Sequence, residues 1–181
     1  LFGRQIALLF VSADEIARTF TSIDSPVKKE LVSLLGESIL DKSGILDRKK
    51  IAGIVFSDKN AIAKLNGLLH PLIRQKTLDL IQSIQDGRMI AWEAPLLFES
   101  KGENICDATL TVYAGYEDSW QRVKKRDEIS EDEFRNRLAN QMDIKEKLEA
   151  SDFKIINDKD IDHLLSECKI IYREITQRRL S

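Results

Sequence analysis

The side chain best placed to do chemistry is Asp14, which follows an apolar run at residues 6–11 and a polar break at Ser12. Such a run ending in polar residues predicts a buried strand that leads into a helix. Ligands of open α/β sheets bind just outside the carboxyl ends of the strands, so Asp14 has the position of a catalytic carboxylate. The alternative is that Asp14 only complements the dipole at the start of the helix. Considered by itself, Asp14 fits both roles.

A second group of candidates consists of polar side chains spaced four residues apart. Arg122 and Arg126 share one face of an expected helix over residues 117–127, because side chains at i and i+4 are neighbours. Arg137 and Gln141 repeat this spacing in the next expected helix, which opens with a Ser-Glu-Asp-Glu capping box. Guanidinium groups match phosphate oxygens, so this segment suits a phosphate-binding lid. It equally suits a solvated helical hairpin held together by ion pairs.

Short apolar runs are expected to form the strands that position these groups. The expected strands are residues 6–11, 89–94, 107–113 and 153–156. Because helical patterns separate them, the sequence predicts a parallel α/β sheet with right-handed crossovers. A helix after the last strand is expected to pack on this sheet through Ile161, Leu164, Leu165, Cys168, Tyr172 and Ile175.

Residues 24–87 contain helical patterns and no strand signal, which predicts an all-helical insertion. Ser25-Pro26 and Asp47 are typical starts for two helices. The third helical pattern is much longer and includes Pro71, which is expected to bend the helix or divide it in two.

The composition is that of an ordinary soluble globular protein with room for one sizeable core. The chain has 181 residues, of which 43% are hydrophobic and 32% charged, and its net charge of −2 argues against broad affinity for nucleic acid. No signal peptide and no apolar run of the roughly 18 residues that span a membrane are visible, so a cytoplasmic location is expected. Cys106 and Cys168 are isolated and are expected to be reduced core thiols without a metal role.

Six motifs, in order along nearly the whole chain, closely resemble those of the dephospho-CoA kinase family. They are SADEIAR (12–18), LLHPLIR (68–74), APLLFE (94–99), QRVKKRD (121–127), RLANQ (137–141) and IIND (155–158). The resemblance implies a P-loop NTPase-like fold, with a parallel sheet flanked by helices, an all-helical substrate-binding insertion and a helical lid. It also implies an enzyme that uses ATP and Mg2+ to phosphorylate the ribose 3′-hydroxyl of dephospho-CoA, the last step of coenzyme A synthesis.

The same resemblance implies a domain organisation and roles for individual residues. The nucleotide-binding core is expected at residues 1–23, 88–115 and 151–181, the coenzyme-A-binding insertion at 24–87, and the lid at 116–150. Asp14 matches the family's catalytic carboxylate, and Arg122 matches its active-site arginine. Acceptor-binding positions are implied at Arg18, His70, Pro71, Arg74, Pro95, Leu96, Leu97 and Phe98. Positions near ATP or in the lid are implied at Arg126, Arg137, Gln141 and Asn157.

The chain departs from the family pattern at three places. Ser12 stands where the acidic motif usually begins with aspartate, and Glu93 stands where many members have the shorter aspartate, which changes its reach toward magnesium through water. No G-x-x-x-x-G-K-[ST] motif occurs, although Leu1-Phe2 resembles the end of the helix that follows such a loop. We therefore expect the gene to encode this motif within about 25 residues upstream of Leu1.

Two other functions remain open from the sequence. Another P-loop kinase acting on a small molecule or nucleotide would share the same core. A noncatalytic coenzyme-A-binding or scaffold protein would need no phosphate-binding loop. For a dephospho-CoA kinase, the expected partners are dephospho-CoA and ATP, with no nucleic acid and no membrane.

Overall fold

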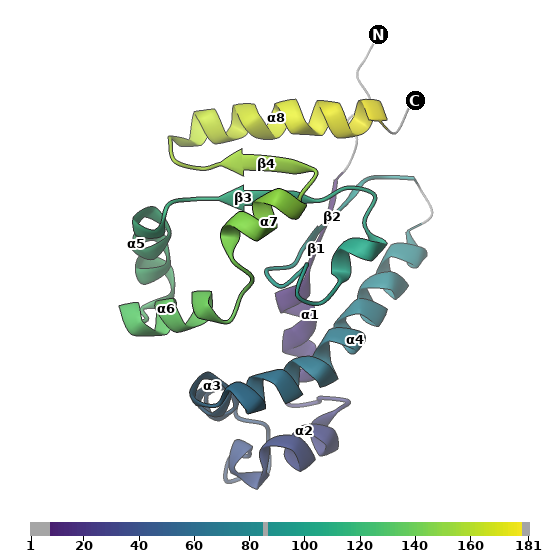
Figure 1. Ribbon diagram of the computed structural model, residues 1–181. Helices are drawn as coiled ribbons and strands as arrows, with labels where there is room; N and C mark the ends of the chain where they lie inside the picture. Colours follow the sequence, from purple (N-terminus) through teal and green to yellow (C-terminus); the bar gives the residue numbers. More distant parts are fainter. Residues whose placement is uncertain (1–7, 85–86, 179–181) are drawn as a thin grey trace. The chain divides into compact units, whose positions relative to one another are not determined.

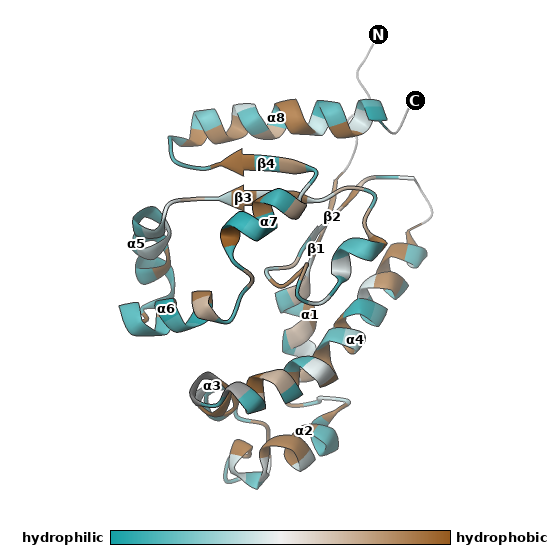
Figure 2. Cartoon of the chain, in the orientation of Figure 1, coloured by the Kyte–Doolittle hydropathy of each residue, from teal (hydrophilic) through white to brown (hydrophobic). Residues whose placement is uncertain are grey.

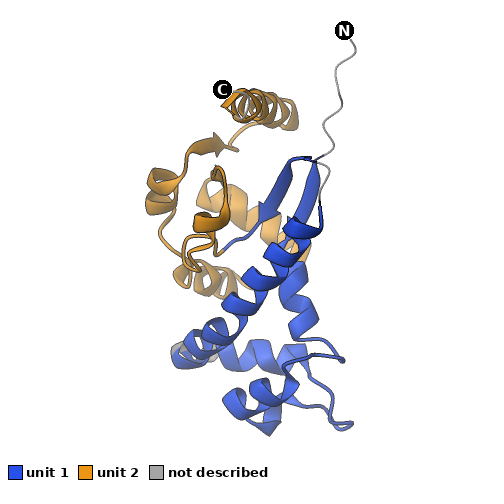
Figure 3. Cartoon of the chain, turned by 90° about the vertical axis from the view of Figure 1, so that its right-hand side faces the viewer, with its two compact units in different colours: residues 1–95 blue, residues 96–181 orange. Residues whose placement is uncertain are grey.

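The computed structural model describes residues 8–84 and 87–178 (Figure 1). Ile6 and Ala7 of the first predicted strand, and the Leu1-Phe2 pair, lie outside these described residues. The chain divides into two compact units, Leu1–Pro95 and Leu96–Ser181 (Figure 3). Within the described residues, none of the helices combines the length and the apolar character that crossing a membrane requires.

The first unit contains a pair of parallel strands, β1 (Leu9–Ser12) and β2 (Ile90–Glu93). Their register places Ser12 opposite Glu93, so both strands end at the same edge. Helix α1 (Ala13–Phe20) starts directly after β1. The structure thus confirms a strand that leads into a helix and the predicted second strand. The first strand is less buried than predicted, because Phe10 is 62% exposed and only Val11 and Ser12 of β1 are buried.

The rest of the first unit is helical. After β1 and α1 come α2 (Lys28–Leu35), the 3-10 helix η1 (Glu37–Ile39), α3 (Arg48–Ser57) and α4 (Lys59–Ser83). The Asp47 carboxylate accepts hydrogen bonds from the N–H groups of Lys49 and Lys50, which confirms the predicted cap of α3. Helix α2 begins later than Ser25-Pro26 predicts, because the Ser25 hydroxyl accepts the Val27 N–H ahead of the helix. The core of these helices consists of Leu31, Ile39, Leu46 and Ile51.

Helix α4 continues through Pro71 as one element of 25 residues, so the predicted division at this proline is wrong (Figure 1). Proline removes one backbone hydrogen bond from a helix interior. Helix α4 packs against α1, α2 and α3, and burial of an amphipathic face supplies most of a helix's stability in a folded protein. This packing keeps the helix continuous across the missing bond.

The second unit is built on another pair of parallel strands, β3 (Leu110–Tyr113) and β4 (Phe153–Ile156). Its helices are η2 (Gly102–Ile105), α5 (Tyr116–Asp127), α6 (Glu131–Ala139), α7 (Ile144–Ala150) and α8 (Ile161–Arg178). Strand β3 is shorter than the predicted 107–113, because the Thr109 N–H and hydroxyl both donate to the Asp152 carboxylate at 2.8 Å ahead of the strand. Figure 2 shows that α5 and α6 are mostly hydrophilic, whereas β4 is largely hydrophobic.

Helix α8 packs on β4 through a narrower stripe than predicted. Phe153, Ile155 and Ile171 form the buried cluster, and Leu164 and Ile175 pack against it. Ile161 is 64% exposed, Leu165 is 48% exposed, and Cys168 is exposed. The prediction is therefore wrong for these three residues, and Cys168 is not a core thiol. Ile171, which the prediction did not include, is the buried residue of α8, and the contact line runs through Leu164, Ile171 and Ile175.

Candidate active site

The first candidate site residue stands at the corner between β1 and α1. Ser12 is the N-cap of α1, and its hydroxyl accepts the Glu15 N–H at 3.4 Å. The same hydroxyl donates to Glu93 Oε2 at 3.1 Å. Ser12 is 7% exposed, so the bond ties the end of β1 to the end of β2 from within the fold. These two hydrogen bonds of Ser12 fix the backbone at the start of α1, where Asp14 follows.

Asp14 is the second residue of α1 and is exposed. Its carboxylate makes no hydrogen bond or ion pair with any residue that the structure describes. In open α/β sheets, ligands bind just outside the carboxyl ends of the strands, which is where α1 begins. Asp14 therefore has an unengaged carboxylate at a position where a substrate group can reach it.

The acceptor candidates of the first unit are distributed over α1 and α4, which pack against each other. Arg18 is exposed on α1, whereas Arg74 is partly buried on α4, one turn beyond His70. Pro71 is exposed between them on α4, and Pro95 follows β2.

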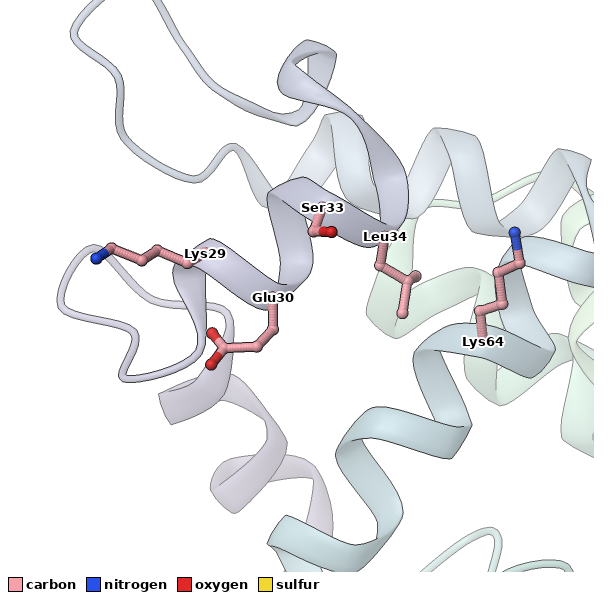
Figure 4. Close-up of a pocket in the computed structure, with 5 residues that line it drawn as sticks. All are labelled: Lys29, Glu30, Ser33, Leu34 and Lys64. Atoms are coloured by element: carbon pink, nitrogen blue, oxygen red, sulfur yellow. The ribbon is translucent and has the colours of Figure 1, made fainter.

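A hollow of about 590 Å3 in the same unit does not include any of these candidates (Figure 4). Its lining comes from α2 and α4 and consists of Lys29, Glu30, Ser33, Leu34 and Lys64. In Figure 4 the ammonium group of Lys29 points away from the other lining side chains. The hollow is thus separate from the predicted acceptor residues on α1 and α4.

The acceptor candidates of the second unit, Leu96, Leu97 and Phe98, lie in a tight turn and are partly buried. The Gly102 N–H donates to the Leu97 carbonyl at 2.7 Å, and the Lys101 N–H donates to the Phe98 carbonyl at 3.1 Å. These backbone bonds fix the turn from within.

Arg122 and Asn157 are brought together by the fold. The Arg122 guanidinium, on the exposed face of α5, donates through Nη2 to the Asn157 carbonyl oxygen at 3.2 Å. Asn157 follows β4, and its N–H donates to the Tyr113 carbonyl at 2.6 Å. Arg122 is therefore held at the edge where β3 and β4 end, and its partner there is a neutral group.

Arg126 and Arg137 are brought together by Asp127, a residue for which the sequence predicted no role. Both nitrogens of the Arg126 fork donate to Asp127, at 2.6 and 3.0 Å, and Arg137 Nη1 donates to the same carboxylate at 2.8 Å. Hydrogen bonds from Arg126 and then Arg137 lower the pKa of Asp127 to about 2. The predicted ion pairs between charged helices are therefore present, together with the clustered arginines.

Gln141 does not share a helical face with Arg137, so that prediction is wrong. Helix α6 ends at Ala139, with Asn140 as its C-cap, and the Gln141 N–H bonds back to the Leu138 carbonyl at 3.0 Å. The predicted capping box at the other end of α6 is present, with bonds in both directions between Ser130 and Glu133.

The amino-acid sequence matches one known protein family over most of its length. The family model described as dephospho-CoA kinase matches residues 2–163. The chain belongs to the dephospho-CoA kinase family. It is 40% identical to the dephospho-CoA kinase of Leptospira interrogans, over 94% of this chain and 82% of that protein. It is 32% identical to the Aquifex aeolicus dephospho-CoA kinase, over 96% of this chain and 88% of that protein.

Solved structures agree with this membership. A crystal structure of a Thermus thermophilus protein matches with a TM-score of 0.75 and 27% identity, over 94% of this chain and 86% of that one. A dephospho-CoA kinase from Campylobacter jejuni matches with a TM-score of 0.65 and 30% identity, over 96% and 87%. The chain is accordingly a kinase that functions in coenzyme A biosynthesis.

For a dephospho-CoA kinase, the contacts missed by sequence reasoning are those made across long stretches of chain. Lys147 Nζ lies 2.9 Å from Glu99 Oε1, and the Met142 N–H donates to the same oxygen. Glu99 is the last residue of the APLLFE motif, so the family resemblance was the sequence signal that pointed to this position. Nothing in its local pattern indicates Lys147 as its partner.

Proposed function

We propose that this kinase transfers the γ-phosphoryl group of ATP to the ribose 3′-hydroxyl of dephospho-CoA, with Asp14 as the base. The observation that carries the proposal is the exposed, unengaged Asp14 carboxylate on a corner fixed by Ser12 and Glu93. Asp14 orients the acceptor hydroxyl and takes its proton as the oxygen forms its bond to phosphorus. The bond from phosphorus to the leaving oxygen of ADP breaks in the same displacement.

Arg122 stabilises the negative charge on the transferring phosphoryl group. Its hydrogen-bond partner among the described residues is the neutral carbonyl of Asn157, so its positive charge is not balanced by a carboxylate in that contact. Arginines in this role contribute roughly 10³ to 10⁵ in rate in related phosphoryl-transfer enzymes. Asn157 lies in the loop that approaches the adenine end of ATP and sets the position of Arg122.

Residues 116–150 act as a lid over the nucleotide, to which Arg126, Arg137 and Gln141 contribute. Phosphoryl transfer requires that water be kept from the γ-phosphoryl group, since an open site would hydrolyse ATP. The ion pairs that Asp127 makes with Arg126 and Arg137 hold two lid cations together before ATP arrives.

The proposal includes the finer organisation of the fold. A P-loop NTPase-like core is formed by residues 1–23, 88–115 and 151–181. The coenzyme-A-binding insertion is residues 24–87. The acceptor is held by Arg18, His70, Pro71, Arg74 and residues 95–98. We place this activity in the cytoplasm.

Magnesium fits the residues at the corner as a partner of ATP. Mg2+ is held in such sites by one or two carboxylates together with substrate phosphates and water, and it neutralises phosphate charge. Glu93 offers one exposed carboxylate whose direction is fixed by the Ser12 hydroxyl. In the described residues, no group of three or more His, Cys, Asp or Glu side chains is arranged to hold a metal ion. Glu93 would thus hold the ion jointly with ATP.

The test combines thermal shift with product analysis in the full chain. Dephospho-CoA is expected to raise Tm in the presence of ATP and Mg2+, whereas nucleoside monophosphates are not, because ligands that bind the native state stabilise it. Turnover should yield ADP and coenzyme A. Stabilisation and turnover by a nucleoside monophosphate instead would identify a different kinase acceptor.

A further inference from the structure

The second unit contains a largely buried ion pair that the reaction described above does not use. The side chains of Lys147 and Glu99 are 11% and 19% exposed, and their charged atoms lie 2.9 Å apart. Glu99 Oε1 also accepts the Met142 N–H at 2.6 Å. Glu99 Oε2 is buried and has no hydrogen-bond partner among the described residues.

Such a pair is a poor device for stability alone. Removing two charges from water costs several kcal/mol per ion, and apolar replacements of similar volume are often as stable or more stable. The polar contact between Glu99 and the Met142 backbone therefore points to a requirement for position.

Met142 lies at the junction between the charged helices and the body of its unit. Gln141 precedes it directly, and the junction runs from the end of α6 at Ala139 to the start of α7 at Ile144. Helix α7 is attached to β3, because the Lys147 carbonyl accepts the hydroxyls of Ser151 at 2.7 Å and Thr111 at 3.4 Å. Helix α6 instead packs on α5, where Trp120 stacks on Phe134 with ring centroids 5.6 Å apart.

Glu99 belongs to a turn that is fixed independently of this junction. The Ser100 N–H donates to the Leu96 carbonyl at 3.0 Å, and the Gly102 N–H donates to the Leu97 carbonyl. The residues before Glu99 are the acceptor candidates Leu96, Leu97 and Phe98. One carboxylate thus links the turn that carries these residues to the backbone beside Gln141.

We propose that Glu99 is a positioning residue that fixes the base of the lid to the acceptor turn by accepting the Met142 N–H. The inference rests on the proposed function of residues 116–150 as a lid. Glu99 acts through Met142 on the placement of Gln141 and Arg137. Lys147 supplies the countercharge of the Glu99 carboxylate, with Nζ 2.9 Å from Oε1.

The experiment compares two double variants of the full chain, Glu99→Gln/Lys147→Met and Glu99→Met/Lys147→Met. Both remove the two buried charges, so a difference between the two variants does not come from the loss of charge. Only the glutamine variant retains a side-chain oxygen that can accept the Met142 N–H. We expect the methionine variant to have an ATP KM about tenfold higher and about tenfold more ATP hydrolysis per transfer, since small misplacements near a reacting group cost that much.

Hydrogen exchange at the Met142 amide supplies a measurement that does not depend on turnover. Exchange should be about tenfold faster in the methionine variant than in the glutamine variant, because a lost hydrogen bond of about 1.4 kcal/mol corresponds to that factor. Glu174→Gln, which removes an exposed charge from α8 outside the lid, is the control and should change neither ATP KM nor Met142 exchange.

The outcomes separate the two proposals. Equal ATP KM in the two double variants overturns the positioning role, whether or not Met142 exchange differs. A wild-type chain that does not phosphorylate dephospho-CoA overturns the proposed function instead, and unequal exchange in that case still establishes the link from Glu99 to Met142.

Discussion

The corner at the end of β1 and the charged helices α5 and α6 hold their candidate residues in opposite ways. At the corner, the buried Ser12 hydroxyl locks the backbone to Glu93, while the Asp14 carboxylate makes no hydrogen bond or ion pair with any described residue. On the helices, Arg126 and Arg137 both donate to Asp127. The first arrangement offers a reactive group on a fixed frame, whereas in the second any incoming phosphate must replace an internal carboxylate.

Arg122 shares one feature with each arrangement: it is held in place, yet no carboxylate balances its charge in that contact. It is held in place, as Arg126 is, but by a neutral carbonyl at 3.2 Å. A hydrogen bond to a carbonyl orients a guanidinium without cancelling its charge. Of the arginines on α5, Arg122 is therefore the one whose contact leaves most of its charge for a phosphoryl group.

The largest effect is expected from Asp14→Asn. The amide keeps the size of the side chain but cannot accept the acceptor's proton, so kcat should fall by roughly 10² or more while Tm stays within about 2 °C of wild type. Steady-state kinetics with dephospho-CoA and ATP provide the measurement.

Glu15→Gln is the matched control for Asp14→Asn, because Glu15 is the next residue on α1 and is also exposed in its first turn. Both substitutions remove one negative charge near the helix N-terminus. Similar small effects of the two substitutions would return Asp14 to a role in complementing the helix dipole.

The next effect is expected from Arg122→Lys. Lysine keeps the positive charge but not the planar fork, so contacts that strengthen as charge moves in the transition state are weakened. We expect kcat to fall about tenfold to a hundredfold, with a smaller change in either KM. Arg126→Lys, one turn away on α5, should be milder because Arg126 is already engaged with Asp127. Equal, small effects at both positions would count against a catalytic Arg122.

What the sequence predicted well is what depends on neighbours along the chain. The predicted caps at Asp47 and Ser130 are present because each needs only a side-chain oxygen and an N–H a few residues away. The strand ends that carry Asp14 and Asn157 were likewise predicted from local apolar runs. These features depend on local geometry, which a sequence pattern encodes directly.

What the sequence did not predict depends on contacts between distant segments. Glu99 in its turn pairs with Lys147 on α7, and Asp127 on α5 pairs with Arg137 on α6. Both contacts depend on which segments pack together. The prediction of which α8 residues are buried was wrong for the same reason, since the strand beneath the helix decides which positions are covered. The continuity of α4 through Pro71 is set by its packing on three other helices.

A smaller effect, on stability, is expected from Ser12→Ala. The substitution removes the cap of α1 and the hydrogen bond to Glu93, which together should cost about 2 kcal/mol in the free energy of unfolding. Ser12→Thr retains a hydroxyl and is the control. Urea unfolding measures both. If alanine and threonine are equally stable, the corner is held by the strand pairing alone, and the contrast with the charged helices disappears.

The smallest effect is expected from Asp127→Asn, and its pH dependence has a definite sign. Because the Arg126 and Arg137 hydrogen bonds lower the pKa of Asp127 to about 2 from its usual 3.8, the ionised carboxylate stabilises the fold above pH 3.8. This stabilisation is lost as the pH falls from 3.8 through about 2. Arg126 is 73% exposed, so solvent screening limits the loss in Asp127→Asn to about 1 kcal/mol at pH 7.

Glu128→Gln is the control for the Asp127 measurement, because it removes one negative charge from the adjacent, exposed residue. Unfolding in urea at pH 7 and pH 2.5 should show wild type and Asp127→Asn converging at the lower pH, whereas the small offset of Glu128→Gln does not follow the Asp127 titration. A gap between wild type and Asp127→Asn that stays constant over this range would mean that the amide is at a disadvantage for reasons of packing. The arginines would then be held by the packing of their helices. The corner at the end of β1 and the charged helices would differ in geometry but not in how charge is balanced.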